Sequence, residues 1–129
     1  MWRNILLVGI GSFAGGVLRY LVSLGTQAAR LRWAESVIWQ SAFPWATFAV
    51  NLLGCLLIGL LMGWSTRLSQ EWTLLLTVGL CGGFTTFSTF SKESLLLMQT
   101  GSYGLSALYI LGSLLLGIAL VAAGWWMAK

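Results

Sequence analysis

The stretch at residues 79–91, GLCGGFTTFSTFS, interrupts a long apolar segment and constrains how the whole chain can fold. A helix in lipid must satisfy its own backbone hydrogen bonds, because no water is present to satisfy them. Three glycines followed by a run of Thr and Ser are poorly suited to a continuous helix there. The stretch therefore predicts a break in a membrane-spanning helix, and we expect this break to line a polar path and to bind an ion.

The composition is that of an integral membrane protein. Hydrophobic residues make up 58% of the 129 residues and charged residues 8%, whereas a soluble domain carries about 25% charged residues. The seven Lys and Arg residues are scattered, so no basic patch for nucleic acid is present. There is no His, and the two Cys form no CxxC pair, which leaves zinc, haem and His-based acid–base chemistry unsupported. The sequence offers no nucleophile–base pair for an enzyme either.

Apolar segments predict four membrane spans, at about residues 4–27, 44–64, 72–100 and 105–126. We expect one all-α domain, residues 1–129, and take the first apolar run as a span because no cleavage site stands out in it. Trp45 and Trp64 frame the second span, and their 19-residue separation corresponds to about 28 Å of helix. The polar connection 28–43 is expected to be a loop, with room for a short interfacial helix carrying Trp33 and Trp39.

Charge is nearly balanced between the two ends of this predicted bundle. One end carries Arg3, Arg67 and Lys129, and the other carries Arg30 and Arg32. The positive-inside rule then barely selects an orientation, so the chain can insert both ways and pair with its own inverted copy. Glycines on the helix faces, among them the GxxxG pair Gly11 and Gly15, also suggest a partner. We therefore expect an antiparallel homodimer.

Three polar residues lie within or near the ends of the predicted spans, where they are costly and usually functional. Asn51 is either a pore-lining donor or an interhelical hydrogen bond that holds the bundle together. Arg19 either extends to the interface or attracts anions in a vestibule. Glu93 is expected to accept hydrogen bonds from Arg19 or from backbone freed by the break. It is less suited to carrying protons, because no second intramembrane acid completes a relay.

The residues of the break itself allow several roles. Hydroxyls at residues 85–91 can bond back to the helix backbone, but the run is too dense beside Gly-Gly for that to explain all of them. Phe87 and Phe90 either pack or present their positive ring edges to an anion. Carbonyls freed by unwinding at Gly82 and Thr85 can coordinate a hard cation such as Na⁺.

Residues 82–91, GGFTTFSTFS, with Glu93 just beyond, closely resemble the signature of the Fluc/CrcB fluoride channels. Matches in the other spans support the resemblance, which covers all four of them. They are Gly15-Gly16 with Arg19-Tyr20, Thr47 with residues 50–54 (VNLLG), and Gly112-Ser113.

The resemblance implies a dual-topology antiparallel homodimer that conducts F⁻ passively through two pores and rejects Cl⁻. It also implies a central structural Na⁺, held by the carbonyls of Gly82 and Thr85 of each subunit, and a bacterial inner-membrane location, where the channel relieves cytoplasmic fluoride. Glu93 is given a structural role, and Arg19 and Thr47 are implied as vestibule residues. The implied fluoride-pore residues are Asn51, Thr86, Phe87, Ser88, Thr89, Phe90, Tyr109 and Ser113.

The sequence departs from the family pattern in a few places. Ala46 replaces a common glycine, Phe84 replaces a leucine, Gly117 stands where a fourth-span hydroxyl is frequent, and the connection 28–43 is long. Two other classes remain as alternatives: a small proton-coupled exporter using Glu93 as its coupling site, and a non-transporting assembly subunit. The latter has a use for the glycine faces but none for the hydroxyl run.

Overall fold

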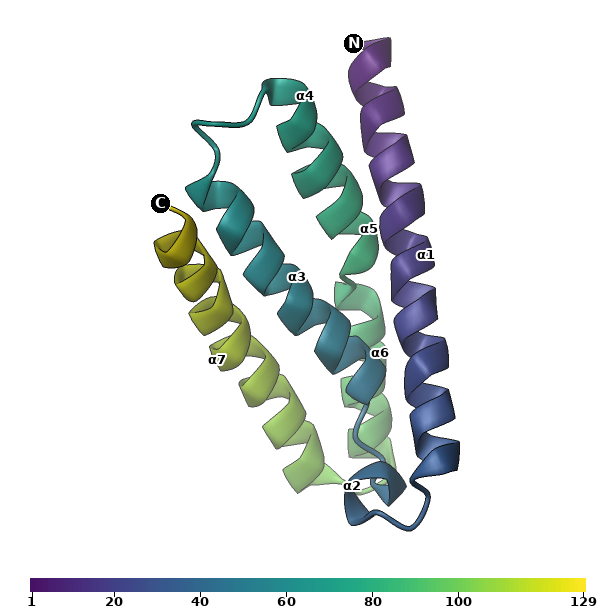
Figure 1. The fold of residues 1–129 in the computed structure, drawn as a ribbon. Coiled ribbons are helices and arrows are strands. Elements are labelled where there is room, and N and C mark those ends of the chain that lie inside the picture. The colour runs from purple at the N-terminus through teal and green to yellow at the C-terminus, as the bar shows by residue number, and fades with distance from the viewer.

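The computed structural model describes all residues 1–129 and contains helices but no strand (Figure 1). In chain order the helices are α1 (Trp2–Arg32), α2 (Val37–Gln40), α3 (Trp45–Gly63), α4 (Gln70–Thr73), the π-helix η1 (Leu74–Cys81), α5 (Gly82–Phe84), α6 (Phe87–Gln99) and α7 (Tyr103–Ala128). Four helical segments are long and apolar enough to cross a membrane, with α4 to α6 forming one of them, Gln70–Gln99. The predicted all-α fold with four candidate spans is confirmed.

The four long segments form two packed pairs (Figure 1). Helix α1 lies against η1 and α5, and α3 lies along α7. Both chain ends and α4 lie at one end of the bundle, and α2 lies at the other. This arrangement agrees with an even number of crossings.

The connection 28–43 is more helical than expected. Helix α1 extends into this connection and ends at Arg32, and α2 carries Trp39. Ala, Leu and Arg are strong helix formers, and Arg30 and Arg32 lie in the last turn of α1, where cations stabilise a helix end. Polarity alone had suggested a loop here, but these residue types favour continuation of the helix.

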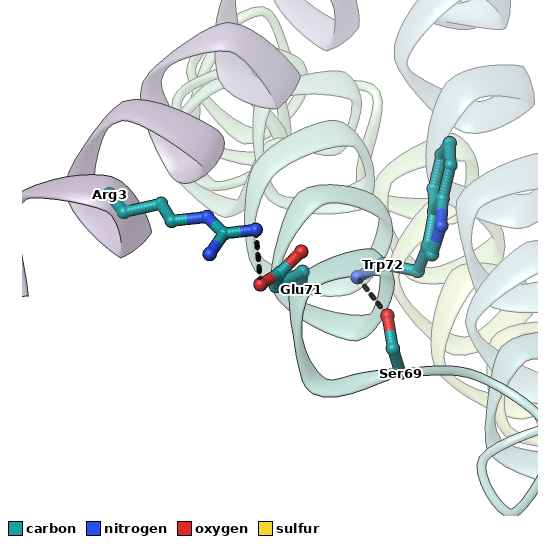
Figure 2. A network of polar contacts seen from close by, with 4 residues as sticks. All are labelled: Arg3, Ser69, Glu71 and Trp72. Carbon is teal, nitrogen blue, oxygen red and sulfur yellow. Dashed lines mark hydrogen bonds and ion pairs between the residues drawn. The ribbon is translucent and has the colours of Figure 1, made fainter.

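The α4 end of the bundle is fixed by short polar contacts (Figure 2). Ser69 precedes α4, and its Oγ accepts a hydrogen bond from the Trp72 backbone N–H at 3.3 Å. Arg3 of α1 forms an ion pair with Glu71 of α4. Both side chains are well exposed, so the pair contributes little to stability. Its main effect is to neutralise one cation at the end that holds both chain ends.

Little of the chain is buried within one subunit. Only 19 of 129 residues are buried, and large apolar side chains cover the outside of all four long segments. Exposed apolar surface on this scale needs lipid or another subunit against it. The central buried cluster consists of Phe43, Phe90, Leu97 and Tyr109.

The GxxxG pair of α1 is used inside the subunit. A Cβ added at Gly11 would meet the Leu75 carbonyl and the Gly79 backbone, and one added at Gly15 would meet the Leu80 carbonyl. These glycines let α1 approach η1 and α5 closely. They are therefore already occupied and do not form a free surface for a second copy.

Replacement of Gly11 by alanine is expected to push α1 away from η1, because the obstacles are backbone atoms that cannot rotate away. We expect a loss of about 1–3 kcal/mol of stability, typical of an overpacked contact, measured by thermal unfolding of the purified protein in detergent. Gly9→Ala is the matched control, since nothing lies within 4 Å of the added Cβ there. Equal unfolding temperatures for the two variants would contradict this account of the packing.

Candidate functional site

The third helical segment changes conformation at Thr85 and Thr86. Their backbone angles are extended (φ −90°, ψ 160° and φ −152°, ψ 116°), and they separate α5 from α6. Both residues lie within the Gly/Ser/Thr stretch that interrupts the apolar segment. The side chain of Asn51 on α3 takes the place of the missing helical acceptor and adds a donor to the Thr86 carbonyl. Its Oδ1 accepts from the Thr86 N–H at 2.8 Å, and its Nδ2 donates to the Thr86 carbonyl at 3.1 Å.

Two carbonyls lose their usual helical donors at this point. In a continuous α-helix the Thr86 N–H would donate to the Gly82 carbonyl, and the Thr89 N–H to the Thr85 carbonyl. Here the Thr86 N–H donates to Asn51, and the Thr89 N–H donates to Thr86 Oγ1 at 3.3 Å. Carbonyl oxygens without donors are suitable ligands for a hard cation.

Hydroxyl groups surround the start of α6. Thr86 Oγ1 caps the helix through the Thr89 N–H and also donates to Thr89 Oγ1 at 3.1 Å. Ser88 Oγ lies 3.5 Å from Thr86 Oγ1. Ser91 Oγ and Thr85 Oγ1 instead donate to carbonyls four residues earlier. The back-bonding that the sequence allowed therefore occurs at Thr85 and Ser91, whereas Thr86 caps α6.

Phe87 and Phe90 have different surroundings although their ring centroids lie only 5.9 Å apart. Phe90 is buried and packs on Tyr109, with centroids 5.1 Å apart. Phe87 is 77% exposed, and Phe90 is the one aromatic ring that it contacts within the chain. Packing therefore accounts for Phe90 but leaves the exposed Phe87 ring unexplained.

A cavity of 420 Å³ lies between α3, the third segment and α7. The buried Oγ of Ser113 has no hydrogen-bond partner in the subunit, and Ser113 lines this cavity. Seven residues singled out from the sequence line it: Asn51, Gly82, Thr85, Thr86, Phe87, Phe90 and Ser113.

A second cavity, of 320 Å³, lies between α1, α3 and α6. It is lined by Arg19, Thr47, Thr89 and Glu93 among the residues identified from the sequence. Thr86 lines both cavities, so both spaces border the extended residues between α5 and α6.

The Glu93 carboxylate is held by two side-chain hydroxyls. Thr47 Oγ1 donates to its Oε1 at 2.8 Å, and Tyr109 OH donates to its Oε2 at 3.0 Å. Arg19 shares the second cavity with Glu93 but forms no ion pair with it. The partners of Glu93 are therefore neither Arg19 nor the freed backbone, the two that sequence reasoning had suggested. Thr47 and Tyr109 occupy its oxygens because α3 and α7 both pack beside α6.

Tyr109 and Ser88 line neither cavity, although both were expected along the polar path. Tyr109 is completely buried and reaches the second cavity only through its bond to Glu93, whereas Ser88 is exposed on α6. Sequence reasoning missed Ser23 and Thr77, which line the second and first cavities. Each lies four residues from another lining residue, Arg19 or Cys81, and this helical spacing was the available signal.

Comparison with known proteins identifies the family of this chain. The family model described as CrcB-like protein, Camphor Resistance (CrcB), matches residues 6–125. The chain belongs to the CrcB family. The match includes the second and third candidate spans and most of the first and fourth, so CrcB membership applies to the whole bundle and to both cavities.

Curated relatives agree with CrcB membership along nearly the full chain. A protein of Phocaeicola vulgatus is 45% identical and covers 98% of this chain and 99% of its own length. A protein of Chlorobaculum tepidum is 47% identical, covering 98% and 95%, and one of Oceanobacillus iheyensis is 45% identical, covering 95% and 88%. Each is named "Fluoride-specific ion channel FluC". The CrcB family is thus one of channels and not of enzymes.

Proposed function

We propose that this chain is the subunit of a fluoride-selective channel that conducts F⁻ passively across the membrane and lowers cytoplasmic fluoride. The observation that carries the proposal is the position of Thr86, which lines two cavities whose walls include hydroxyl and amide groups. The names of the relatives point to the same ion. The localisation that fits is the inner membrane of a bacterium, where such a channel gives fluoride resistance.

Fluoride is small and strongly hydrated, so its entry into a narrow path requires close donors to replace water. The Asn51 amide has two N–H groups and uses one on the Thr86 carbonyl, which leaves the other for an ion. Ser113 Oγ lies unpartnered at the first cavity. The Thr89 hydroxyl accepts from Thr86 Oγ1 and keeps its own hydrogen to donate at the second cavity. Larger halides gain less from donors this close and fit a narrow path poorly.

We assign the aromatic pair to the same path. The edge of a phenyl ring is positive, so an anion passing beside Phe87 and Phe90 is attracted to it. Both rings line the first cavity with Asn51 and Ser113. The hydroxyl of Tyr109 acts less directly, by holding the Glu93 carboxylate beside the second cavity.

The second cavity is proposed as the vestibule. Arg19 supplies a positive charge there that raises the local concentration of anions. Thr47 and Thr89 supply hydroxyls between this arginine and the break. Glu93 has a structural role, because its two hydroxyl partners come from α3 and α7 and connect both helices to α6.

The functional unit is proposed to be an antiparallel dual-topology homodimer with two pores. Supporting features are the near balance of cations at the two ends and the exposure of Phe87 and Gly82 next to the first cavity. An inverted copy placed over this face would cover both residues. Nothing within the subunit lies within 4 Å of a Cβ added at Gly82, so there is room for another backbone.

A structural Na⁺ fits the backbone at the break. The carbonyls of Gly82 and Thr85 have lost their usual helical donors and line the first cavity. In the dimer, two such carbonyls from each subunit would hold the ion. Bound Na⁺ would supply positive charge that stabilises the unwound backbone of both copies.

Fluoride efflux from liposomes that contain the purified protein tests the function. We expect rapid F⁻ efflux down its gradient and negligible Cl⁻ efflux under the same conditions, measured with ion-selective electrodes. Protein-free liposomes give the background, and size-exclusion chromatography checks that the protein is folded. Folded protein that releases no fluoride would overturn the proposal.

A further inference from the structure

The connection between α1 and α3 sends one side chain into the buried cluster of the bundle. Phe43 is the only buried residue of the range 28–43. It belongs to the same buried cluster as Phe90 and Tyr109. A residue outside the long helices is therefore part of the packing behind the proposed pore.

Ring contacts lead from this connection to the first cavity. Phe43 lies edge-on to Tyr109, with centroids 5.4 Å apart and an interplanar angle of 80°. Tyr109 lies 5.1 Å from Phe90, which in turn lies 5.9 Å from Phe87. Tyr109 is fully buried, so a change in the Phe43 ring must alter the packing of its neighbours.

Polar contacts hold Phe43 in place. Arg30, in the last turn of α1, donates from Nη2 to the Phe43 carbonyl at 2.7 Å. The Trp45 ring packs on Phe43 with centroids 4.5 Å apart. Trp45 Nε1 also donates to the Ile38 carbonyl at 3.2 Å, which ties the connection to the start of α3. The position of Phe43 thus depends on a hydrogen bond from a charged donor, which is stronger than a bond between two neutral groups.

We propose that Phe43 is a positioning residue of the permeation path, held by Arg30 and acting through Tyr109. Through the Tyr109 ring it orients the Phe90 side chain. Through the Tyr109 hydroxyl it fixes the Glu93 carboxylate beside the second cavity. The connection between α1 and α3 thereby influences both cavities without touching the ion. The effect on fluoride rests on the proposed function, whereas the effect on Phe90 does not.

The first test measures position 90 directly. 4-Fluorophenylalanine placed at residue 90 of the full chain gives a ¹⁹F NMR signal in detergent micelles. We expect Phe43→Leu and Arg30→Gln to shift or broaden this signal. Arg32→Gln is the matched control, because it removes the same charge from the same turn but Arg32 contacts only the Trp33 ring. An unchanged signal in both Phe43→Leu and Arg30→Gln would overturn the proposal, whether or not the protein conducts fluoride.

The second test measures flux and selectivity in liposomes. Loss of one aromatic contact predicts efflux about two- to tenfold slower in Phe43→Leu and Arg30→Gln, with a lower F⁻ to Cl⁻ ratio. If Arg30 acted only as a vestibule charge, Arg32→Gln would slow efflux equally and added salt would remove the difference. That result would contradict positioning. Absence of flux in the unmodified protein would refute the proposed function alone, since the ¹⁹F signal still decides the role of Phe43.

Discussion

Replacing Asn51 by alanine should both destabilise the protein and strongly slow fluoride transport. The Thr86 N–H would lose its partner, the Asn51 Oδ1 2.8 Å away, at a buried residue. The Thr86 carbonyl would lose one donor but keep another, since as the N-cap it also accepts the first hydrogen bond of α6. One unsatisfied backbone N–H costs about 1–3 kcal/mol. Loss of a donor to an ion predicts efflux slower by roughly ten- to a hundredfold. Thermal unfolding and liposome efflux measure the two effects separately.

Asn51→Asp keeps the acceptor of this side chain and removes its donors. One aspartate oxygen accepts from the Thr86 N–H, but the other takes the place of Nδ2 and repels the Thr86 carbonyl. We expect a loss of stability at least as large as in Asn51→Ala, because a buried negative charge is added, and fluoride efflux at least as slow. Efflux at the original rate in a folded Asn51→Asp protein would show that the amide does not contact the ion.

The second large effect is expected at the aromatic pair. Phe87→Ile should suppress fluoride efflux with little change in subunit stability, because the ring is 77% exposed and packs mainly on Phe90. Phe90→Ile should suppress efflux and also lower stability by about 1–3 kcal/mol, because it opens space in the buried cluster. In both variants, efflux should fall because a positive ring edge beside the path is lost.

Phe84→Ile is a suitable control for the aromatic pair. Phe84 lies in α5 next to the break but lines neither cavity. Its replacement should leave the ratio of F⁻ to Cl⁻ efflux unchanged. Efflux that is unaffected by Phe87→Ile, with an unchanged elution volume in size-exclusion chromatography, would exclude a ring-edge role for that residue.

Local features of the fold could be read from the sequence. Apolar segments of membrane length gave the four candidate spans, and residue types that disfavour helix marked the stretch where Thr85 and Thr86 are extended. Asn51 shows the limit of this reasoning. The sequence left it as either a pore donor or an interhelical bond, and the structure adds the bond to Thr86 without removing the second N–H from use.

Contacts between distant segments could not be predicted. Thr47 and Glu93 are 46 residues apart, and Arg30 pairs with a carbonyl in a connection without helical periodicity. Periodicity assigns a residue to a face but does not say which side chain of another helix meets it. Phe43 was missed for this reason, since one phenylalanine in a polar connection gives no sign that it is buried.

The π-helix η1 (Leu74–Cys81) gives this protein some tolerance to changes in chain length. Bonding from i to i+5 holds one more residue in each turn than an α-helix does. Loss of one residue from η1 can therefore be absorbed by a return to α-helical bonding, with the faces before and after it nearly preserved. No such reserve exists at Thr86, where the backbone is paired with a side chain of α3. A one-residue deletion should accordingly be accepted in η1 and rejected at Thr86.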